Sequence, residues 1–511
     1  MWPLLSRGDE AVRVRYWVAL SLAGLALRAA LIPVSPAWGY HRDHDLFVRW
    51  AILATDYSLL TVYDGPPPKH DIQVWDAQTR SFVRTEEQQR DWCNYPPLSV
   101  YLLYVSGLVF KVLSPERLIN TWLSHAIFSS WTILADFLLA WGCAATVAHF
   151  RPGRAAFWTY AAVLLAPPLW YDSLVWGQVD SWVLAPAVWM LWAILRQRWI
   201  LAGVLYGIAA GLKPQAVLFL PLWGLVLLTS RQPIKVLLSG LIAGAVLGLC
   251  ALPFMLHSGW AWLKLSYIGN FFHAAPYTTL SAFNIWYVDA LLGTTKSATL
   301  TWLGLTKDVW GRTFLLIALA VGFVGVLIRW RREPRGLLIW TVLSLLAFMM
   351  LPTRVHERYL VLVLPFLIML AVLYARFVPT VVILALVMMA QITWPHWIKL
   401  RPGAWVDFFE PAARIDYEAY LTELPPQERA RAQTYDEFTR DARQEFAATR
   451  ARSAPFEWMG TILALLASAG VATTAATLKP PPAALQQTTR AERKTTGTEK
   501  QKGRIRGARS R

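Results

Sequence analysis

Apolar stretches long enough to cross a membrane recur along this 511-residue chain, and they constrain its fold more than any other feature. A lipid bilayer offers the backbone no hydrogen-bonding partners, so only helices and closed barrels can span it. Charged residues make up 16% of the chain, whereas soluble proteins carry roughly a quarter. The sequence therefore predicts an all-α polytopic membrane protein.

Lysine and arginine in short connecting loops mark the cytoplasmic side of a membrane protein. Basic connectors occur at 151–154, 196–198, 231–235 and 329–335. If all of them lie inside, the chain crosses the membrane about twelve times and both termini are cytoplasmic. The predicted spans are 16–35, 117–149, 155–171, 181–195, 199–212, 214–230, 235–256, 309–330, 335–351, 359–376, 378–397 and 457–478.

This count requires that the apolar segment 97–113 does not cross the membrane. The segment follows Tyr95-Pro96, and prolines suit the start of a helix. We interpret it as a juxtamembrane or re-entrant helix within a long first external loop, 36–116. An ordinary short span is the alternative interpretation.

The predicted organisation has four parts. A transmembrane region, 1–397, is followed by a polar external insert, 398–456, whose composition predicts one or two amphipathic helices on the membrane surface. A last span, 457–478, leads to a C-terminal tail, 479–511.

The tail carries ten basic and two acidic residues, a large part of the net charge of +17, and its composition predicts disorder. Such a tail can bind nucleic acid or anionic lipid. Beside so many spans, the charge favours a cytoplasmic tail near lipid, so we expect no nucleic-acid partner. The cysteines Cys93, Cys143 and Cys250 suggest neither a disulfide nor a metal site.

Polar residues that are unusual at membrane boundaries all fall on the predicted external side. Ionisable groups in such places usually bind a ligand or take part in chemistry. They come from several separate loops, which suggests one shared site. The set comprises Asp43, Asp45, Asn94, Tyr95, Arg117, Gln178, Asp180, Lys213, Arg354, His356 and Arg358.

The chemistry of this set suits a phosphate-bearing lipid and a hydroxyl acceptor. A carboxylate such as Asp43 or Asp45 can act as general base. Arginine suits phosphate through its planar donors, and lysine acts as a point charge. The candidate phosphate-binding residues are Arg117, Lys213, Arg354, His356 and Arg358.

Each candidate also has a structural interpretation. Asp43 and Asp45 can cap a helix or be solvated in a loop, and Gln178 and Asp180 can cap a helix that begins at Ser181. Lys213 can snorkel toward the membrane surface.

Arg354 and Arg358 can pair with Glu357 or anchor in headgroups. Asp136 lies within a span as a buried partner, and we assign it no role. The run His41–Asp45 can bind a metal. However, Arg42 disfavours this and the sequence offers no distant ligands, so we expect no metal site.

Five motifs in order resemble a known family. They are Asp43–Trp50, Asn94-Tyr95-Pro96-Pro97-Leu98, Gln178–Asp180, Lys213–Gln215 and Thr353–Arg358. The pattern resembles the GT-C fold glycosyltransferases that use polyprenyl- or dolichyl-phosphate sugars. It is most similar to the glucosyltransferases of the lipid-linked precursor of asparagine glycans and to prokaryotic mannosyltransferase relatives.

The resemblance implies inverting transfer of a hexose, mannose or glucose, without a cofactor or an obligatory metal. It implies that Asp43 is the catalytic base and that His356, with Arg358, contacts the donor phosphate. We assign acceptor or orienting roles to Asp45, Asn94, Tyr95, Gln178 and Asp180. The expected partners are a polyprenyl- or dolichyl-phosphate sugar, membrane lipid, and a glycan, lipid or protein acceptor.

Three positions depart from the family pattern. Asn94 stands where the family has an acidic residue, Asp45 where it has Glu, and Arg358 where it has Lys. These departures leave the acceptor open.

A transporter or flippase of lipid-linked sugars would use a similar basic pocket without chemistry. Such proteins often contain internal repeats and mid-membrane polar sites. This chain has neither feature, so the sequence favours an enzyme. Compact external loops favour a prokaryotic plasma membrane with the active site outside; in a eukaryote the site would face the lumen of the endoplasmic reticulum.

Overall fold

The structure is a computed structural model. It describes residues 10–38, 41–64, 70–76, 81–87, 93–269, 278–280, 282–292, 301–331, 333–398, 421 and 433–480.

The first half of the chain forms short and long helices in alternation. They are α1 (Glu10–Leu31), η2 (Ile32–Val34), α2 (Ser35–Trp38), α3 (His41–Asp56), η3 (Leu59–Tyr63), α4 (Pro97–Leu113), α5 (Trp122–Phe150), α6 (Arg154–Leu164), α7 (Pro167–Trp170), η4 (Tyr171–Trp176), α8 (Asp180–Leu195), α9 (Trp199–Leu212), η5 (Pro214–Phe219), α10 (Leu220–Thr229) and α11 (Pro233–Ser258).

The second half contains the remaining helices. They are α12 (Ala261–Leu263), η6 (Lys264–Gly269), α14 (Tyr287–Leu291), α15 (Lys307–Trp330), α16 (Arg335–Met350), η7 (Tyr359–Val363), α17 (Leu364–Leu373), η8 (Ala375–Phe377), α18 (Val378–Ile398), α20 (Tyr435–Phe438) and α21 (Arg440–Thr477).

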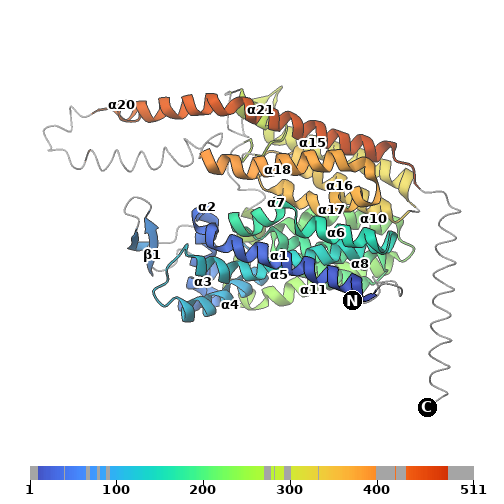
Figure 1. Ribbon diagram of the computed structural model, residues 1–511, viewed down its shortest axis with the longest axis horizontal. Coiled ribbons are helices and arrows are strands. Elements are labelled where there is room, and N and C mark those ends of the chain that lie inside the picture. Colours follow the sequence, from blue (N-terminus) through green and yellow to red (C-terminus); the bar gives the residue numbers. More distant parts are fainter. Residues whose placement is uncertain are drawn as a thin grey trace, which may run out of the picture.

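The long helices run roughly parallel to one another as a bundle (Figure 1). The N-terminus and the C-terminal end of α21 lie at one end of the bundle, and α2 and α3 lie at the other, which we call the α3 end (Figure 1). The α3 end matters for function because the site described below is built there.

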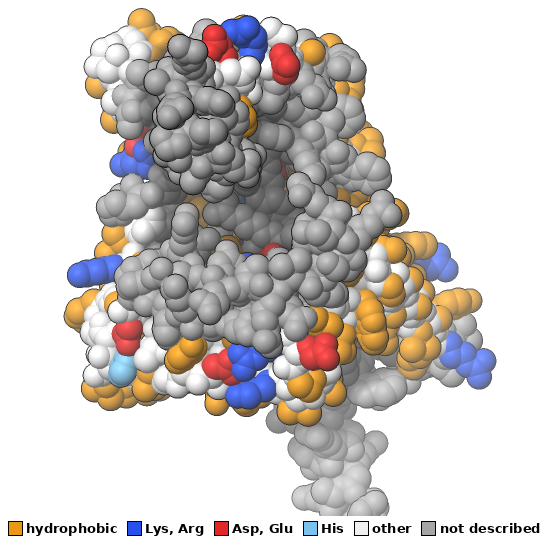
Figure 2. All heavy atoms as spheres, turned by 90° about the vertical axis from the view of Figure 1, so that its left-hand side faces the viewer, with side chains coloured by type: hydrophobic (Ala, Val, Ile, Leu, Met, Phe, Trp, Pro, Cys, Tyr) orange, Lys and Arg blue, Asp and Glu red, His pale blue; other side chains and the backbone are white. Residues whose placement is uncertain are grey.

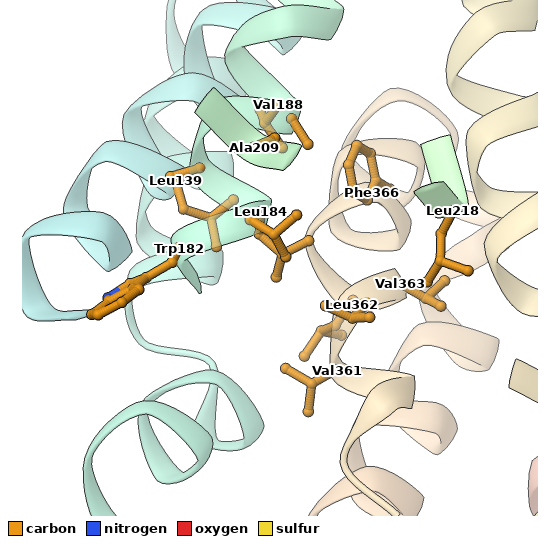
Figure 3. Packing of buried hydrophobic residues seen from close by; sticks show 14 of the residues in the cluster. Leu139, Trp182, Leu184, Val188, Ala209, Leu218, Val361, Leu362, Val363 and Phe366 are labelled. Atoms are coloured by element: carbon orange, nitrogen blue, oxygen red, sulfur yellow. The ribbon is translucent and has the colours of Figure 1, made fainter. Parts of the chain in front are cut away.

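Helix α8 is the centre of the core. Nearly all of its residues are buried, and it packs between α5 and α9. Figure 3 shows Leu184 and Val188 of α8 in the same core as Leu362 of η7 and Phe366 of α17. The two halves of the chain are therefore joined through one continuous apolar core.

Six helices among the described residues are long and apolar enough to cross a membrane. They support the prediction of an all-α membrane protein. The other predicted spans correspond to shorter helices, such as α8 with 16 residues, about 24 Å long at 1.5 Å per residue. The count of about twelve spans and the GT-C fold are still predictions.

Helix starts follow local sequence signals. Helix α4 begins at Pro97, as the prolines predict, because proline fits the first turn of a helix. Helix α5 begins with a capping box, in which Thr121 accepts from the Ser124 amide and Ser124 accepts from the Thr121 amide.

One local prediction was wrong, and one local element was not predicted. The predicted span 155–171 is not one helix, because α6 ends at Leu164, just before Pro167-Pro168. The first loop also contains an antiparallel hairpin of β1 (His70–Asp76) and β2 (Ser81–Glu87), which the all-α prediction did not include. A second short pair joins β3 (Thr301–Trp302) to β4 (Leu305–Thr306).

The last helix is longer than predicted. Helix α21 has 38 residues and passes through the predicted boundary at 456–457 without a break. Its length of about 57 Å exceeds the ~30 Å of a bilayer core, and its N-terminal part extends beyond the end of α18 (Figure 1). Most of the predicted insert and the tail from 481 lie outside the described residues.

Candidate active site

Asp43 lies in the first turn of α3, and its side chain is 18% exposed. One carboxylate oxygen, Oδ2, accepts hydrogen bonds from Trp176 Nε1 at 2.8 Å and from Gln178 Nε2 at 2.5 Å. Both donors belong to the turn that joins η4 to α8. Asp43 is therefore held by a segment more than 130 residues away in sequence.

Asp180 and Lys213 form a buried ion pair at the adjoining helix ends. Lys213 Nζ lies 2.5 Å from Asp180 Oδ1, and both side chains are 1% exposed. The N-cap of α8 is Val179 and has no side-chain cap, so Asp180 does not cap the helix. Lys213 lies 5.8 Å from the centre of the Tyr95 ring and does not snorkel to the surface.

The loop that follows α16 carries His356, Glu357 and Arg358. Backbone hydrogen bonds to residues 278–280 hold it, including Leu280 N to Val355 O at 3.0 Å and Glu357 N to Leu280 O at 3.0 Å. Gln391 of α18 also donates to the Glu357 carbonyl oxygen. This loop is thus fixed from two other parts of the chain.

Arg358 brings this loop to the other two groups. Its guanidinium lies 3.7 Å from Asp43 Oδ2, 3.9 Å from Asp180 Oδ2 and 3.9 Å from Glu357 Oε1. Arg358 is 9% exposed, and its Nε forms no hydrogen bond within the described part of the chain. The guanidinium can therefore satisfy an incoming anion without first breaking a short ion pair.

His356 is less enclosed, with 31% of its side chain exposed. Desolvation by the surrounding protein lowers the pKa of His356, and the charge of Arg358 lowers it further; Glu357 and Asp43 oppose this shift. The imidazole is therefore neutral near pH 7 and can donate one hydrogen bond.

Figure 2 looks onto the α3 end of the bundle. The surface is hollowed at its centre, and acidic side chains are visible within the hollow (Figure 2).

Two predicted phosphate-binding residues lie elsewhere. Arg117 pairs with Asp56 at the far end of α3, about 20 Å along the helix from Asp43. Arg354 lies 3.9 Å from Asp308 Oδ1. The ion pairs seen for Arg117 and Arg354 in the described structure are thus with carboxylates other than Asp43 and Asp180.

The predicted acceptor or orienting residues fall into two groups. Gln178 and Tyr95 lie inside the cluster, joined by a 3.4 Å hydrogen bond from the Tyr95 hydroxyl to Gln178 Oε1. Asn94 is exposed and Asp45 is half-buried on α3.

Sequence reasoning placed Trp176 in the motif with Gln178 and Asp180 but assigned it no role, and it did not single out Asp172. Trp176 is 1% exposed, whereas tryptophans of membrane proteins are usually interfacial anchors, so its bond to Asp43 had no clear signal. Asp172 is also buried, in η4; desolvation raises its pKa well above the usual value, and the charge of Asp180 adds to this.

The run His41–Asp45 was considered above as an alternative metal site. Among the described residues, no group of three or more His, Cys, Asp and Glu side chains is arranged to hold a metal ion. The side chain of His41 lies outside the described set. We assign no metal ligands.

A groove lies beside the site, between α15, α16 and α21. Its volume is about 550 Å³, and its lining is almost entirely apolar. Ile285, Met350 and Leu351 line one end, and Arg329 and Ala476 line the other. Met350 also lies, together with His356, along a second and much smaller crevice.

Comparison with known families decides the class of protein. The model of glycosyltransferase family 87 matches residues 92–352, about half of the chain. The chain belongs to glycosyltransferase family 87. It is therefore an enzyme that transfers sugars, and family membership favours this over a transporter. A comparison with curated proteins gives no match.

The family 87 match covers part of the site. It includes Tyr95, Gln178, Asp180 and Lys213, whereas Asp43 lies before it and the 353–358 loop follows it. A glycosyltransferase needs a sugar donor and an acceptor.

Proposed function

We propose that this family 87 enzyme transfers a hexose, mannose or glucose, from a polyprenyl-phosphate donor to an acceptor with inversion at the anomeric carbon. The acceptor would be a glycolipid, a lipid-linked oligosaccharide or a protein. The observation that carries the proposal is the meeting of Asp43 with Arg358, which puts a base and a phosphate-binding group 3.7 Å apart.

The proposed reaction is one displacement. The acceptor hydroxyl gives its proton to Asp43 as its oxygen attacks the anomeric carbon of the sugar. The bond from that carbon to the phosphate oxygen breaks, and the phosphate leaves with the electron pair. Arg358 and the neutral imidazole of His356 stabilise the charge that develops on the phosphate.

Asp43 suits the role of base because its two carboxylate oxygens differ in the hydrogen bonds that they accept. Oδ2 accepts two hydrogen bonds, whereas Oδ1 accepts none within the described part of the chain. Since the side chain is partly exposed, Oδ1 is the oxygen that would take the proton.

The groove supports a lipid-linked donor. An apolar groove between membrane helices suits an isoprenoid chain, which can make van der Waals contacts with the side chains that line it. Through Met350, its end comes close to His356. A lipid in the groove would thus carry its phosphate to the site.

The loops of α8 and α9 support an external site. Asp180 opens α8 and Lys213 follows α9, whereas the connection between the two helices carries Arg196 and Arg198. Basic connections favour the cytoplasm. The opposite end, which bears the site, would then face the outside of a prokaryotic plasma membrane.

A donor comparison tests the proposal. Purified enzyme in lipid nanodiscs receives radiolabelled polyprenyl-phosphate mannose or glucose, or the matching nucleotide sugar, with extracted glycolipids as acceptors. We expect transfer only from the lipid donor, and a product whose anomeric configuration is opposite to that of the donor. Transfer from the nucleotide sugar alone, or retained configuration, would contradict the proposal.

A further inference from the structure

The turn between η4 and α8 supplies both hydrogen bonds to Asp43. Trp176 is the last residue of η4, a π-helix, and Gly177 follows it with a φ of 83°. This left-handed conformation suits glycine and reverses the chain within one residue. Trp176 and Gln178 are thereby both directed to Asp43 Oδ2.

The contacts of Gln178 fix the orientation of its amide. Its Oε1 accepts from the Tyr95 hydroxyl at 3.4 Å and from Lys213 Nζ at 3.5 Å. The amide has one acceptor side and one donor side, so its NH₂ group must face Asp43. Gln178 thus links the carboxylate of Asp43 to the charge of Lys213.

Both ends of the turn are fixed to Asp136 of α5. Ser173 Oγ donates to Asp136 Oδ2 at 2.9 Å, and Ser181 Oγ donates to Asp136 Oδ1. Arg28 of α1 pairs with Asp136 at 2.8 Å, and both side chains are at most 3% exposed. A buried charge is costly unless it is paired, so this arrangement holds the turn firmly.

We propose that Trp176 and Gln178 are positioning residues, which hold one oxygen of Asp43 so that the other faces the acceptor. The proposal rests on the proposed role of Asp43 as base. A carboxylate with one fixed oxygen has little freedom to rotate away from the reacting hydroxyl, and small misplacements of a base slow transfer strongly.

Trp176→Phe tests the proposal, because it removes the N–H donor and keeps an aromatic ring. The matched control is Trp182→Phe, which changes a buried tryptophan of α8 whose Nε1 forms no hydrogen bond in the described structure. Transfer from polyprenyl-phosphate hexose is measured at saturating and limiting donor. We expect kcat of Trp176→Phe to fall about 10- to 100-fold with KM unchanged, the effect of one hydrogen bond to a charged group.

Gln178→Glu is the second variant, in case Trp176→Phe does not fold. It keeps an acceptor for Tyr95 and Lys213 but places a carboxylate against Asp43, so we expect a loss of kcat at least as large. Equal kcat for Trp176→Phe and Trp182→Phe, with Gln178→Glu also active, would overturn the positioning role.

Asp43→Asn, assayed in parallel, separates this inference from the proposed function. If Asp43→Asn retains full transfer, Asp43 is not the base and both proposals fail. If Asp43→Asn is inactive while the Trp176 and Gln178 variants match the control, only the positioning role fails.

Discussion

His356 and Arg358 lie two residues apart, yet their surroundings give them different charges. Arg358 stays cationic among three carboxylates. Desolvation lowers the pKa of His356, and Arg358 lowers it further, so His356 is neutral at pH 7. The pair therefore offers a phosphate one charge and one neutral hydrogen-bond donor.

The neutral state of His356 predicts a pH dependence of stability. In the unfolded chain, His356 binds a proton below about pH 6.5, the usual pKa of histidine. In the folded chain the pKa of His356 is lower, so the side chain binds a proton only in more acidic solution. Stability should thus fall as pH drops below about 6.5. Thermal unfolding of purified protein between pH 5 and 8 should show a smaller acid loss for His356→Gln than for the unchanged chain; identical curves would contradict this.

The helices show which features of local structure the sequence patterns predict and which they do not. Proline correctly placed the start of α4 at Pro97. Hydropathy alone predicted one span over 155–171. Pro167-Pro168 cannot continue the preceding helix, and α6 ends before them. Charge in apolar surroundings drew attention to Lys213 and Asp180. The structure pairs the two side chains, and this pairing depends on which helix ends meet.

Other side chains could not be placed from the sequence. Arg117 follows α4, and the sequence grouped it with the external cations. Its partner Asp56 lies at the C-terminal end of α3, whereas Asp43 lies at the start of that helix, so the two sites are far apart. Trp176 carries no charge that would mark it as a candidate site residue. Its contact with Asp43 depends on a π-helix, which no periodicity in the sequence predicts.

The groove between α15, α16 and α21 predicts a donor-specific defect. Gly325 lines it, and a Cβ atom added at this position would meet no atom within 4 Å, so Gly325→Phe introduces a ring at the groove from a position with open space. A ring in the groove would take the place of part of the isoprenoid chain and remove its packing contacts there. We therefore expect KM for a long-chain polyprenyl-phosphate hexose to rise at least about tenfold.

A matched variant checks this result. Gly244 of α11 is also a helical glycine with open space around it, and it lies away from the groove. Gly244→Phe should leave KM unchanged, and a short-chain donor should be used equally well by both variants. If Gly325→Phe binds the long-chain donor normally, the groove does not hold the lipid.

At the scale of the whole molecule, the site is assembled from distant parts of the chain. Asp43 comes from α3, Gln178 and Asp180 from the start of α8, Lys213 from the end of α9, and Arg358 from the loop after α16. The apolar core around α8 holds these helix ends together at one end of the bundle. The buried charges of this cluster lie at one end of the bundle, which suits a membrane enzyme that works at one surface.

The most direct test of this account is single-turnover transfer by Asp43→Asn from a radiolabelled polyprenyl-phosphate hexose. Asparagine keeps the size of the side chain and can accept a hydrogen bond, but it cannot take the proton of the acceptor. We predict that the variant binds the donor as the unchanged enzyme does and transfers sugar at least about 100-fold more slowly. Transfer at the unchanged rate would contradict the central claim that Asp43 is the catalytic base.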